Sequence, residues 1–216
     1  MVYKHQRVGV FIDIQNLYHS AKHLYSARIN YRELIKELSS SRQLIRVIGY
    51  VVKSETALGE KAFFEALEKA GVELRMKDLQ IFPGGVKKAD WDVGMAIDAI
   101  KMAPKLDAVV LATGDGDFVP LVEYLKYTYG VQVEVIAFGK SSSGQLREAV
   151  DDFIDICEDP RAFLIGYRGG VGRYIPGFGG KSGADSNAGR VNADTSIETT
   201  EWDGEGEDPA IKMSGE

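Results

Sequence analysis

The sequence contains almost no cysteine, since Cys157 is the only one among 216 residues. A single thiol excludes a disulfide framework, and no cluster of cysteine and histidine indicates a zinc site. No apolar run approaches the roughly 18 residues of a membrane span, and the N-terminus lacks the cleavage site of a signal peptide. We therefore expect a cytoplasmic protein without a membrane segment, in which Cys157 is a buried core thiol.

The sequence also lacks an excess of basic residues, and its formal net charge is −6. Residues 169–216 hold 9 acidic and 4 basic residues, whereas residues 1–168 hold 23 acidic and 22 basic residues. The near-neutral main part argues against tight, nonspecific coating of duplexes, which depends on many phosphate contacts. It does not exclude a local basic rim.

Familiar phosphate-binding motifs are absent as well. No GxGxxG follows the first apolar run, so dinucleotide binding has no support. A P-loop needs a glycine five residues before the glycine of GKS at 139–141, and Glu134 stands there. A haloacid-dehalogenase-type phosphatase needs a second aspartate two residues after Asp13, where this chain has Gln15.

Short apolar runs alternate with helical patterns along most of the chain, and runs such as VGVFI are typical of strands covered on both faces. This alternation predicts an α/β fold with a Rossmann-like, three-layer α/β/α arrangement around a mostly parallel five- or six-stranded sheet. The predicted strands are 8–12, 44–52, 72–82, 107–112 and 131–137, with a further edge strand at 153–157. The predicted helices are 16–25, 31–38, 55–70, 89–102, 118–127 and 144–150.

In the helix predicted at 89–102, four apolar residues follow the i, i+3, i+4, i+7 spacing of a buried face. These residues are Val93, Ala96, Ile97 and Ile100, and we expect them to point inward.

The composition changes beyond residue 167, where 11 of the 24 glycines fall in the last 48 residues. Few apolar side chains remain there to offset the entropy of ordering. We therefore predict one domain at residues 1–167 and a Gly-rich, acidic, disordered tail at residues 168–216.

Acidic residues stand where predicted strands end. Asp13 follows VGVFI, and Asp115 and Asp117 follow the fourth strand in LATGDGDF. Ligands of open parallel sheets bind at carboxyl ends of strands near a reversal of strand order, so neighbouring strands would bring these carboxylates into one crevice. Asp92, near the start of its helix in KKADWDVGMAIDAI, is a fourth candidate. Asp98 lies roughly 120° around that helix from Asp92 and ranks lower.

Clustered carboxylates repel one another unless a positive charge lies between them. A hard divalent cation, Mg²⁺ or Mn²⁺, would be held by a few carboxylates and waters, with positions left for a phosphate oxygen. Such an ion activates water and polarises phosphorus, so the cluster predicts phosphodiester chemistry.

Each candidate also has a purely structural explanation. Asp117 could cap the following helix, Asp115 could belong to a turn, and Asp92 suits the positive end of a helix dipole. Asn16 could cap the first helix or aim its amide at a phosphate. Asp13 is hardest to explain in this way, because a carboxylate directly after a buried strand must be exposed or partnered.

Other polar residues could support the site. The Thr113 hydroxyl could fix the turn at Asp115, and Lys87 and Lys88 could meet a nucleic-acid backbone, although exposed lysines in a loop usually have no special function. Weaker candidates near predicted strand ends are Lys53, Lys140 and Arg147.

Four blocks together resemble the NYN domain family, specifically its LabA-like branch within the PIN-like nuclease superfamily. The blocks are GVFIDIQNLYHS, KKADWDVGMAIDAI, LATGDGDFVPLVEYLK and GVQVEVIAFGKSSSGQLREAVDDFIDI, and the resemblance covers about residues 7–157. It implies a Rossmann-like, PIN-like sheet and a metal-dependent ribonuclease. The site residues implied by motif are Asp13, Asn16, Asp92, Asp115 and Asp117, and the sequence shows no departure at these positions.

The sequence thus predicts a hydrolase, a metal-dependent endoribonuclease that acts on RNA. Its Mg²⁺ or Mn²⁺ ligands are expected to be Asp13, Asp92, Asp115 and Asp117, and its RNA contacts Asn16, Lys87 and Lys88. The alternative, from a different class, is a regulatory RNA-binding or protein-interaction module that keeps the acidic pocket without cleavage. The sequence leaves this choice open, together with the formation of a homo-oligomer.

Overall fold

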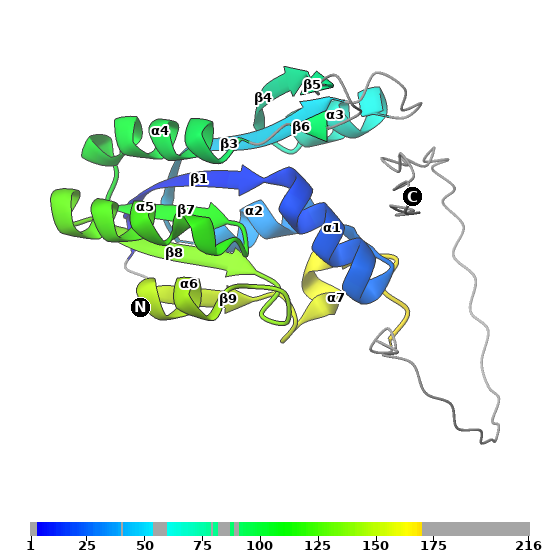
Figure 1. Ribbon diagram of the computed structural model, residues 1–216. Helices are drawn as coiled ribbons and strands as arrows, with labels where there is room; N and C mark the ends of the chain where they lie inside the picture. Colours follow the sequence, from blue (N-terminus) through cyan, green and yellow to red (C-terminus); the bar gives the residue numbers. More distant parts are fainter. Residues whose placement is uncertain are drawn as a thin grey trace, which may run out of the picture.

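The computed structural model describes residues 4–39, 41–53, 60–78, 80–81, 87–88 and 91–169. Within them, six parallel strands form one sheet in the order β4-β3-β1-β7-β8-β9 (Figure 1). The strands are β1 Arg7–Asp13, β3 Gln43–Lys53, β4 Glu73–Asp78, β7 Ala108–Ala112, β8 Gln132–Ala137 and β9 Asp152–Asp155. The predicted α/β fold with a mostly parallel sheet is therefore confirmed.

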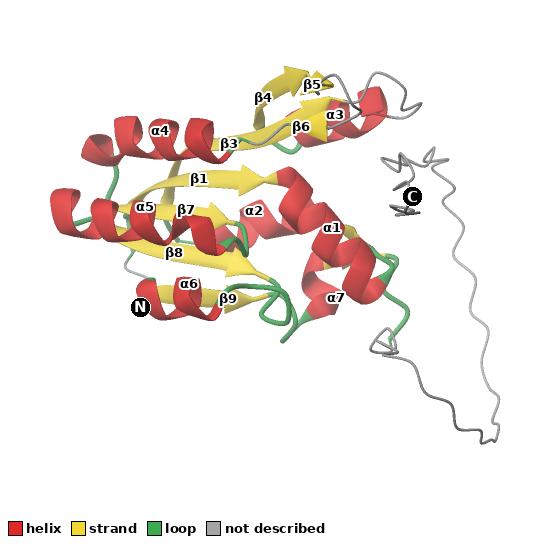
Figure 2. Ribbon diagram, viewed as in Figure 1, coloured by secondary structure: helices red, strands yellow, loops and turns green. Residues whose placement is uncertain are grey.

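Helices cover both faces of this sheet (Figure 2). One face carries α1 Ile14–Tyr25, α2 Tyr31–Ser39, α3 Glu60–Lys69 and α7 Pro160–Phe163. The other carries α4 Asp92–Met102, α5 Val119–Tyr124 with its π-helical continuation η3 Leu125–Tyr129, and α6 Gly144–Ala149. The short 3-10 segments η1 Ala103–Lys105 and η2 Gly116–Phe118 flank β7.

Two short antiparallel pairs lie outside the main sheet, and the sequence patterns did not predict them. They are β2 Arg28–Ile29 with β10 Leu164–Ile165, and β5 Gln80–Ile81 with β6 Lys87–Lys88. The strand predicted at 72–82 therefore ends earlier, because its last described residues belong to the second pair. Pairs of two residues carry too little periodicity for a sequence pattern to reveal them.

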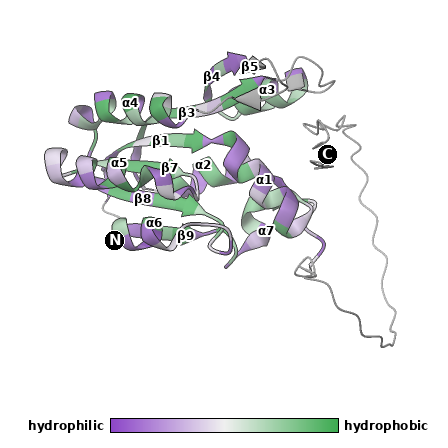
Figure 3. Cartoon of the chain, in the orientation of Figure 1, coloured by the Kyte–Doolittle hydropathy of each residue, from purple (hydrophilic) through white to green (hydrophobic). Residues whose placement is uncertain are grey.

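The central strands are buried on both faces, which explains why their sequences are continuously apolar rather than alternating. In β1, Val10 and Ile12 pack toward the α1–α3 side, whereas Phe11 packs toward the α4–α5 side. Figure 3 shows the same pattern, with apolar residues concentrated on the strands and polar residues on the outer faces of the helices.

The inward face predicted for α4 is correct only in part. Ala96 and Ile100 pack against the core on the α4–α5 side. Met95 and Ala99 are buried, whereas Val93 and Ile97 are 69% and 44% exposed. Asp98 of the same helix accepts a hydrogen bond from the Tyr50 hydroxyl of β3 at 3.1 Å. The buried face of α4 is thus formed by Met95 and Ala99 with Ala96 and Ile100 beside them, and the Val93 and Ile97 part of the predicted stripe faces solvent.

Several predictions fall partly or wholly outside the described residues, among them the start of the helix at 89–102. The others include the start of the helix at 55–70, the disordered tail at 168–216 and, with it, the boundary of the domain. No described helix is both long enough and apolar enough to cross a membrane.

A buried ion pair joins the segment after α2 to β8. Arg42 donates from Nη1 to both carboxylate oxygens of Glu134, at 2.8 and 3.0 Å, and the two side chains are 2% and 0% exposed. Arg42 also donates to the Leu38 carbonyl oxygen, and Gln132 donates to Glu134. Each buried charge is thus compensated by its partner and by further hydrogen bonds.

Replacing one member of this pair should cost more stability than replacing both. Glu134→Leu leaves the Arg42 guanidinium buried without a counter-charge, so we expect the free energy of unfolding to fall by about 3–5 kcal/mol. The double variant Arg42→Met/Glu134→Leu removes both charges and should lie closer to the wild type. Urea denaturation measures this difference, and a double variant as unstable as the sum of the single changes would contradict it.

Candidate metal centre

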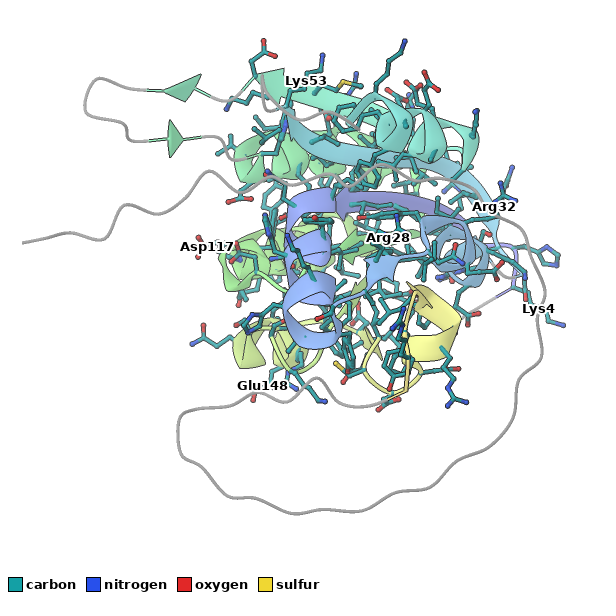
Figure 4. All side chains as sticks on the ribbon, turned by 90° about the vertical axis from the view of Figure 1, so that its right-hand side faces the viewer. Lys4, Arg28, Arg32, Lys53, Asp117 and Glu148 are labelled. Atoms are coloured by element: carbon teal, nitrogen blue, oxygen red, sulfur yellow. The ribbon has the colours of Figure 1, made fainter. Side chains whose placement is uncertain are left out.

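The candidate site lies at the carboxyl edge of the sheet between β1 and β7. Strand order reverses there, because β1 is followed outward by β3 and β4 on one side and β7 by β8 and β9 on the other. Such a reversal opens a crevice where open α/β sheets bind ligands. Figure 4 looks onto this edge, with Asp117 on the side of the α4–α6 layer.

Asp13 ends β1 and caps the helix that follows. Its Oδ1 accepts a hydrogen bond from the Asn16 backbone N–H at 3.0 Å. The alternative that Asn16 caps α1 is therefore wrong. The Asn16 side chain instead accepts a hydrogen bond at Oδ1 from the Gly114 N–H, at 3.0 Å, and so ties α1 to the loop after β7.

The loop after β7 is shaped by its own polar groups. The Asp115 N–H donates to the Thr113 hydroxyl at 3.2 Å, which confirms the predicted role of Thr113. Asp115 in turn accepts at Oδ1 from the Asp117 N–H at 2.9 Å and caps η2. The cap considered for Asp117 therefore belongs to Asp115, and the Asp117 side chain remains exposed.

The two glycines of GDGD allow the β8–α6 loop to pack closely against this site. A Cβ atom on Gly114 would lie 3.1 Å from Ser142, and one on Gly116 would lie 2.8 Å from the Ser143 hydroxyl. The Ser143 N–H also donates to the Gly114 carbonyl oxygen at 2.9 Å. The loop that carries Asp115 and Asp117 is thus supported from α1 on one side and from this serine loop on the other.

Asp92 is placed by its neighbour Trp91, whose role the sequence patterns did not reveal. The Trp91 indole N–H donates to the Val51 carbonyl oxygen of β3 at 2.8 Å, and the ring packs against Tyr50 with centroids 5.6 Å apart. A Cβ atom on Gly94 would lie 2.6 Å from the same ring, so only glycine fits there without a shift. Trp91 therefore anchors the start of α4, where Asp92 is the first residue.

Three of the predicted carboxylates converge. Ligand oxygens of Asp92, Asp115 and Asp117 all lie within 4.8 Å of one another. Carboxylate oxygens are the donors that hard divalent cations prefer, so this set fits Mg²⁺ or Mn²⁺ by its chemistry. Asp98 stands apart from the set, because it accepts from Tyr50 and lies 3.6 Å from the Arg75 guanidinium.

Asp13 lies beside this cluster rather than within it. Burial, together with the negative charges of Asp92 and Asp115, raises the pKa of the Asp13 carboxyl to about 6, although hydrogen bonds from the Asn16 and Gln15 N–H groups oppose the rise. The pKa therefore records that carboxylates from β1, α4 and the β7 loop interact in one crevice.

The predicted lysines contribute less to the described site. The backbone of Lys87 and Lys88 forms β6, and the prediction for their side chains lies outside the described residues. Lys140 stands over the Tyr25 ring, with its ammonium 5.6 Å from the ring centroid. Lys53 is exposed at the end of β3, at the edge of the sheet seen in Figure 4.

The family model of the NYN domain matches residues 7–157, a span that holds all four sequence blocks and every residue of the cluster. The chain belongs to the NYN domain family. Among curated proteins, this NYN domain is similar to the low amplitude and bright protein LabA of Synechococcus elongatus, with 25% identity over 171 residues that cover 76% of this chain and 90% of LabA.

A solved structure is similar as well. The crystal structure of a protein of unknown function from Vibrio parahaemolyticus superposes with a TM-score of 0.69 and 29% sequence identity, covering 76% of this chain and all of that one. The resemblance found in the four sequence blocks is thus confirmed at the level of family and fold.

The raised pKa of Asp13 predicts that Asp13→Asn stabilises the metal-free protein. The folded state holds a proton on Asp13 between the ordinary pKa of 3.8 and the raised pKa of about 6, so stability is lost as pH rises through this window. Asparagine keeps the cap acceptor and removes the charge, and we expect a gain on the order of 1–3 kcal/mol at pH 7.5 that fades by pH 4.

Urea denaturation at both pH values in EDTA measures this gain. Asp159→Asn is the matched control, because Asp159 also caps a helix but is exposed. Destabilisation of Asp13→Asn at pH 7.5 would show that the buried charge carries no cost.

Loosening Trp91 should weaken metal binding without touching a ligand. We expect Trp91→Ala to lower Mn²⁺ affinity by about ten-fold, as is typical when the support of a ligand is lost, and Trp91→Phe, which keeps a ring, to lose less. Titration calorimetry measures both, and Tyr129→Phe on the same face of the sheet serves as the control. Equal affinity in Trp91→Ala and the wild type would mean that Asp92 is held by other contacts.

Proposed function

We propose that this NYN domain is a metal-dependent endoribonuclease that hydrolyses RNA phosphodiester bonds. The observation that carries the proposal is the convergence of Asp92, Asp115 and Asp117 beside Asp13, at the reversal of strand order. The family's place among PIN-like nucleases supports the same reaction class.

Asp92, Asp115 and Asp117 would hold the ion, and Asp13 would add the fourth carboxylate from the end of β1. A bound Mg²⁺ or Mn²⁺ supplies an activated water and an electrophile for the phosphate. These four residues come from three parts of the chain that meet only in the fold: Asp13 from the end of β1, Asp92 from the start of α4, and Asp115 with Asp117 from the loop after β7.

Asn16 would orient the RNA by hydrogen bonding, since its amide does not act as an acid or a base. Its Oδ1 is already used by the Gly114 N–H, so its amide N–H donors are the groups that remain for a phosphate oxygen. Lys87 and Lys88 precede the Asp92 helix and would meet the RNA backbone. Their contribution would be largely electrostatic and would weaken as salt rises.

The proposal predicts that metal binding and RNA cleavage fail together. Asp117→Asn should weaken Mn²⁺ binding at least ten-fold and abolish cleavage of a single-stranded RNA, because it removes one charge from the ligand set. Asp159→Asn is the matched control, since it makes the same change at an exposed carboxylate that caps α7, outside the cluster. Calorimetry with Mn²⁺ and a gel assay of labelled RNA measure the two effects.

The other outcomes separate the rival explanations. Cleavage that persists in EDTA or in Asp117→Asn would point to a contaminating nuclease and contradict the proposal. Tight Mn²⁺ and RNA binding without any cleavage by the wild type would instead favour the regulatory module that keeps the acidic pocket.

A further inference from the structure

Exposed apolar side chains gather on the layer formed by α4, α5 and η3. Val93 and Ile97 on α4 are 69% and 44% exposed, and Tyr124 and Tyr127 are 44% and 95% exposed. Within the part of the chain that the structure describes, these are four of seven large exposed apolar residues. Val93 directly follows Asp92, so this strip begins at the carboxylate cluster.

The tyrosines at the far end of the strip form a built aromatic surface. Tyr124 is the last residue of α5, and Tyr127 lies three residues further on in the π-helical continuation η3. Tyr124 packs edge-to-face on Tyr129, with centroids 5.9 Å apart and an interplanar angle of 80°. Because Tyr124 is already packed on Tyr129, its ring loses little conformational freedom when it binds a flat ligand such as a base. The Tyr127 ring is exposed and accessible to the same kind of ligand.

Two lysines add positive charge at the same end. Lys101 lies in the last turn of α4 and Lys105 ends η1, which contacts η3. Both are exposed, and neither has an ion pair with another described residue. Lys126 is neutralised by Asp151 at 2.9 Å, and Glu123 is the exposed acid of α5. The uncompensated charges of the strip therefore favour an anion.

We propose that this strip binds the single-stranded RNA on one side of the cleaved bond. We call it the α4–α5 surface, and it comprises Val93, Ile97, Lys101, Lys105, Tyr124 and Tyr127. Tyrosine rings stack on bases without regard to sequence, and lysines neutralise phosphates. The inference rests on the proposed function, because it specifies that the RNA bound at that site is single-stranded and that it runs along the α4–α5 surface.

The separation along the helix sets the length of RNA required. Tyr127 is ten residues beyond Asp117, or about 15 Å at roughly 1.5 Å per residue. A stacked strand covers that distance in about four nucleotides at roughly 3.4 Å each. RNA much shorter than this cannot reach both the carboxylates and Tyr127.

Binding of a labelled 12-nucleotide single-stranded RNA to the full-length protein in EDTA tests the inference without cleavage. We expect Tyr127→Ala to weaken binding five-fold or more and Tyr127→Trp to retain it, because stacking needs a ring. Lys105→Ala should weaken binding and reduce the dependence on salt. Lys69→Ala is the matched control on α3, across the sheet, and should change nothing.

Affinity that is unchanged in Tyr127→Ala and Lys105→Ala, or a wild type that does not bind the 12-nucleotide RNA, would overturn the inference. A dimer that Tyr127→Ala converts to monomer in sedimentation, with RNA affinity unchanged, would make the surface a self-association site and equally overturn it. RNA that binds through Tyr127 and is never cleaved would contradict the proposed function alone and leave this inference standing.

Discussion

Mutual repulsion among carboxylates is the constraint on which the rest of this structure depends. Asp92, Asp115 and Asp117 lie together with Asp13 beside them, and the pKa of Asp13 is raised first by burial and then by the charges of Asp92 and Asp115. Unsupported side chains would relieve such repulsion by moving apart. The surrounding hydrogen bonds oppose that movement, since each carboxylate stands at a backbone position fixed by a cap, a turn or an anchored helix start.

The residues that hold the carboxylates in place therefore extend well beyond the carboxylate cluster itself. Asn16 holds the β7 loop from the side of α1, Ser143 holds it from the side of α6, and Trp91 holds the start of α4 against β3. These contacts join the two helical layers across the carboxyl edge of the sheet. Packing in both cores thereby fixes the positions of charges that would otherwise separate.

The sequence was sufficient for the architecture because the central strands carry a strong signal. VGVFI and the apolar run before LATGDGDF are continuous, and strands buried on both faces require that pattern. The orientation of α4 was not predictable in the same way. Its apolar spacing favours Val93, Ala96, Ile97 and Ile100 as the inner face, but only Ala96 and Ile100 pack on the core. Met95 and Ala99 complete the buried face.

The aspartates at the ends of predicted strands indicated the candidate site, whereas no sequence pattern predicted the residues that hold those aspartates in place. A hydrogen bond such as that from Gly114 to Asn16 joins residues 98 positions apart, and no local rule predicts it. Trp91 offered one signal, a large aromatic residue directly before Asp92 in KKADWD. The sequence alone does not show that its indole reaches the carbonyl of Val51.

The parallel pairing of β1 with β7 has a consequence for how the protein acquires its site. Val8 pairs with Ala108, so the two strands that flank the crevice are synthesised about one hundred residues apart and cannot meet early on the ribosome. Closing so long a loop is slow compared with local helix formation. A nascent chain that has released only β1, α1 and β3 carries Asp13 but no partner carboxylates, and it acquires its cluster only when β7 inserts beside β1.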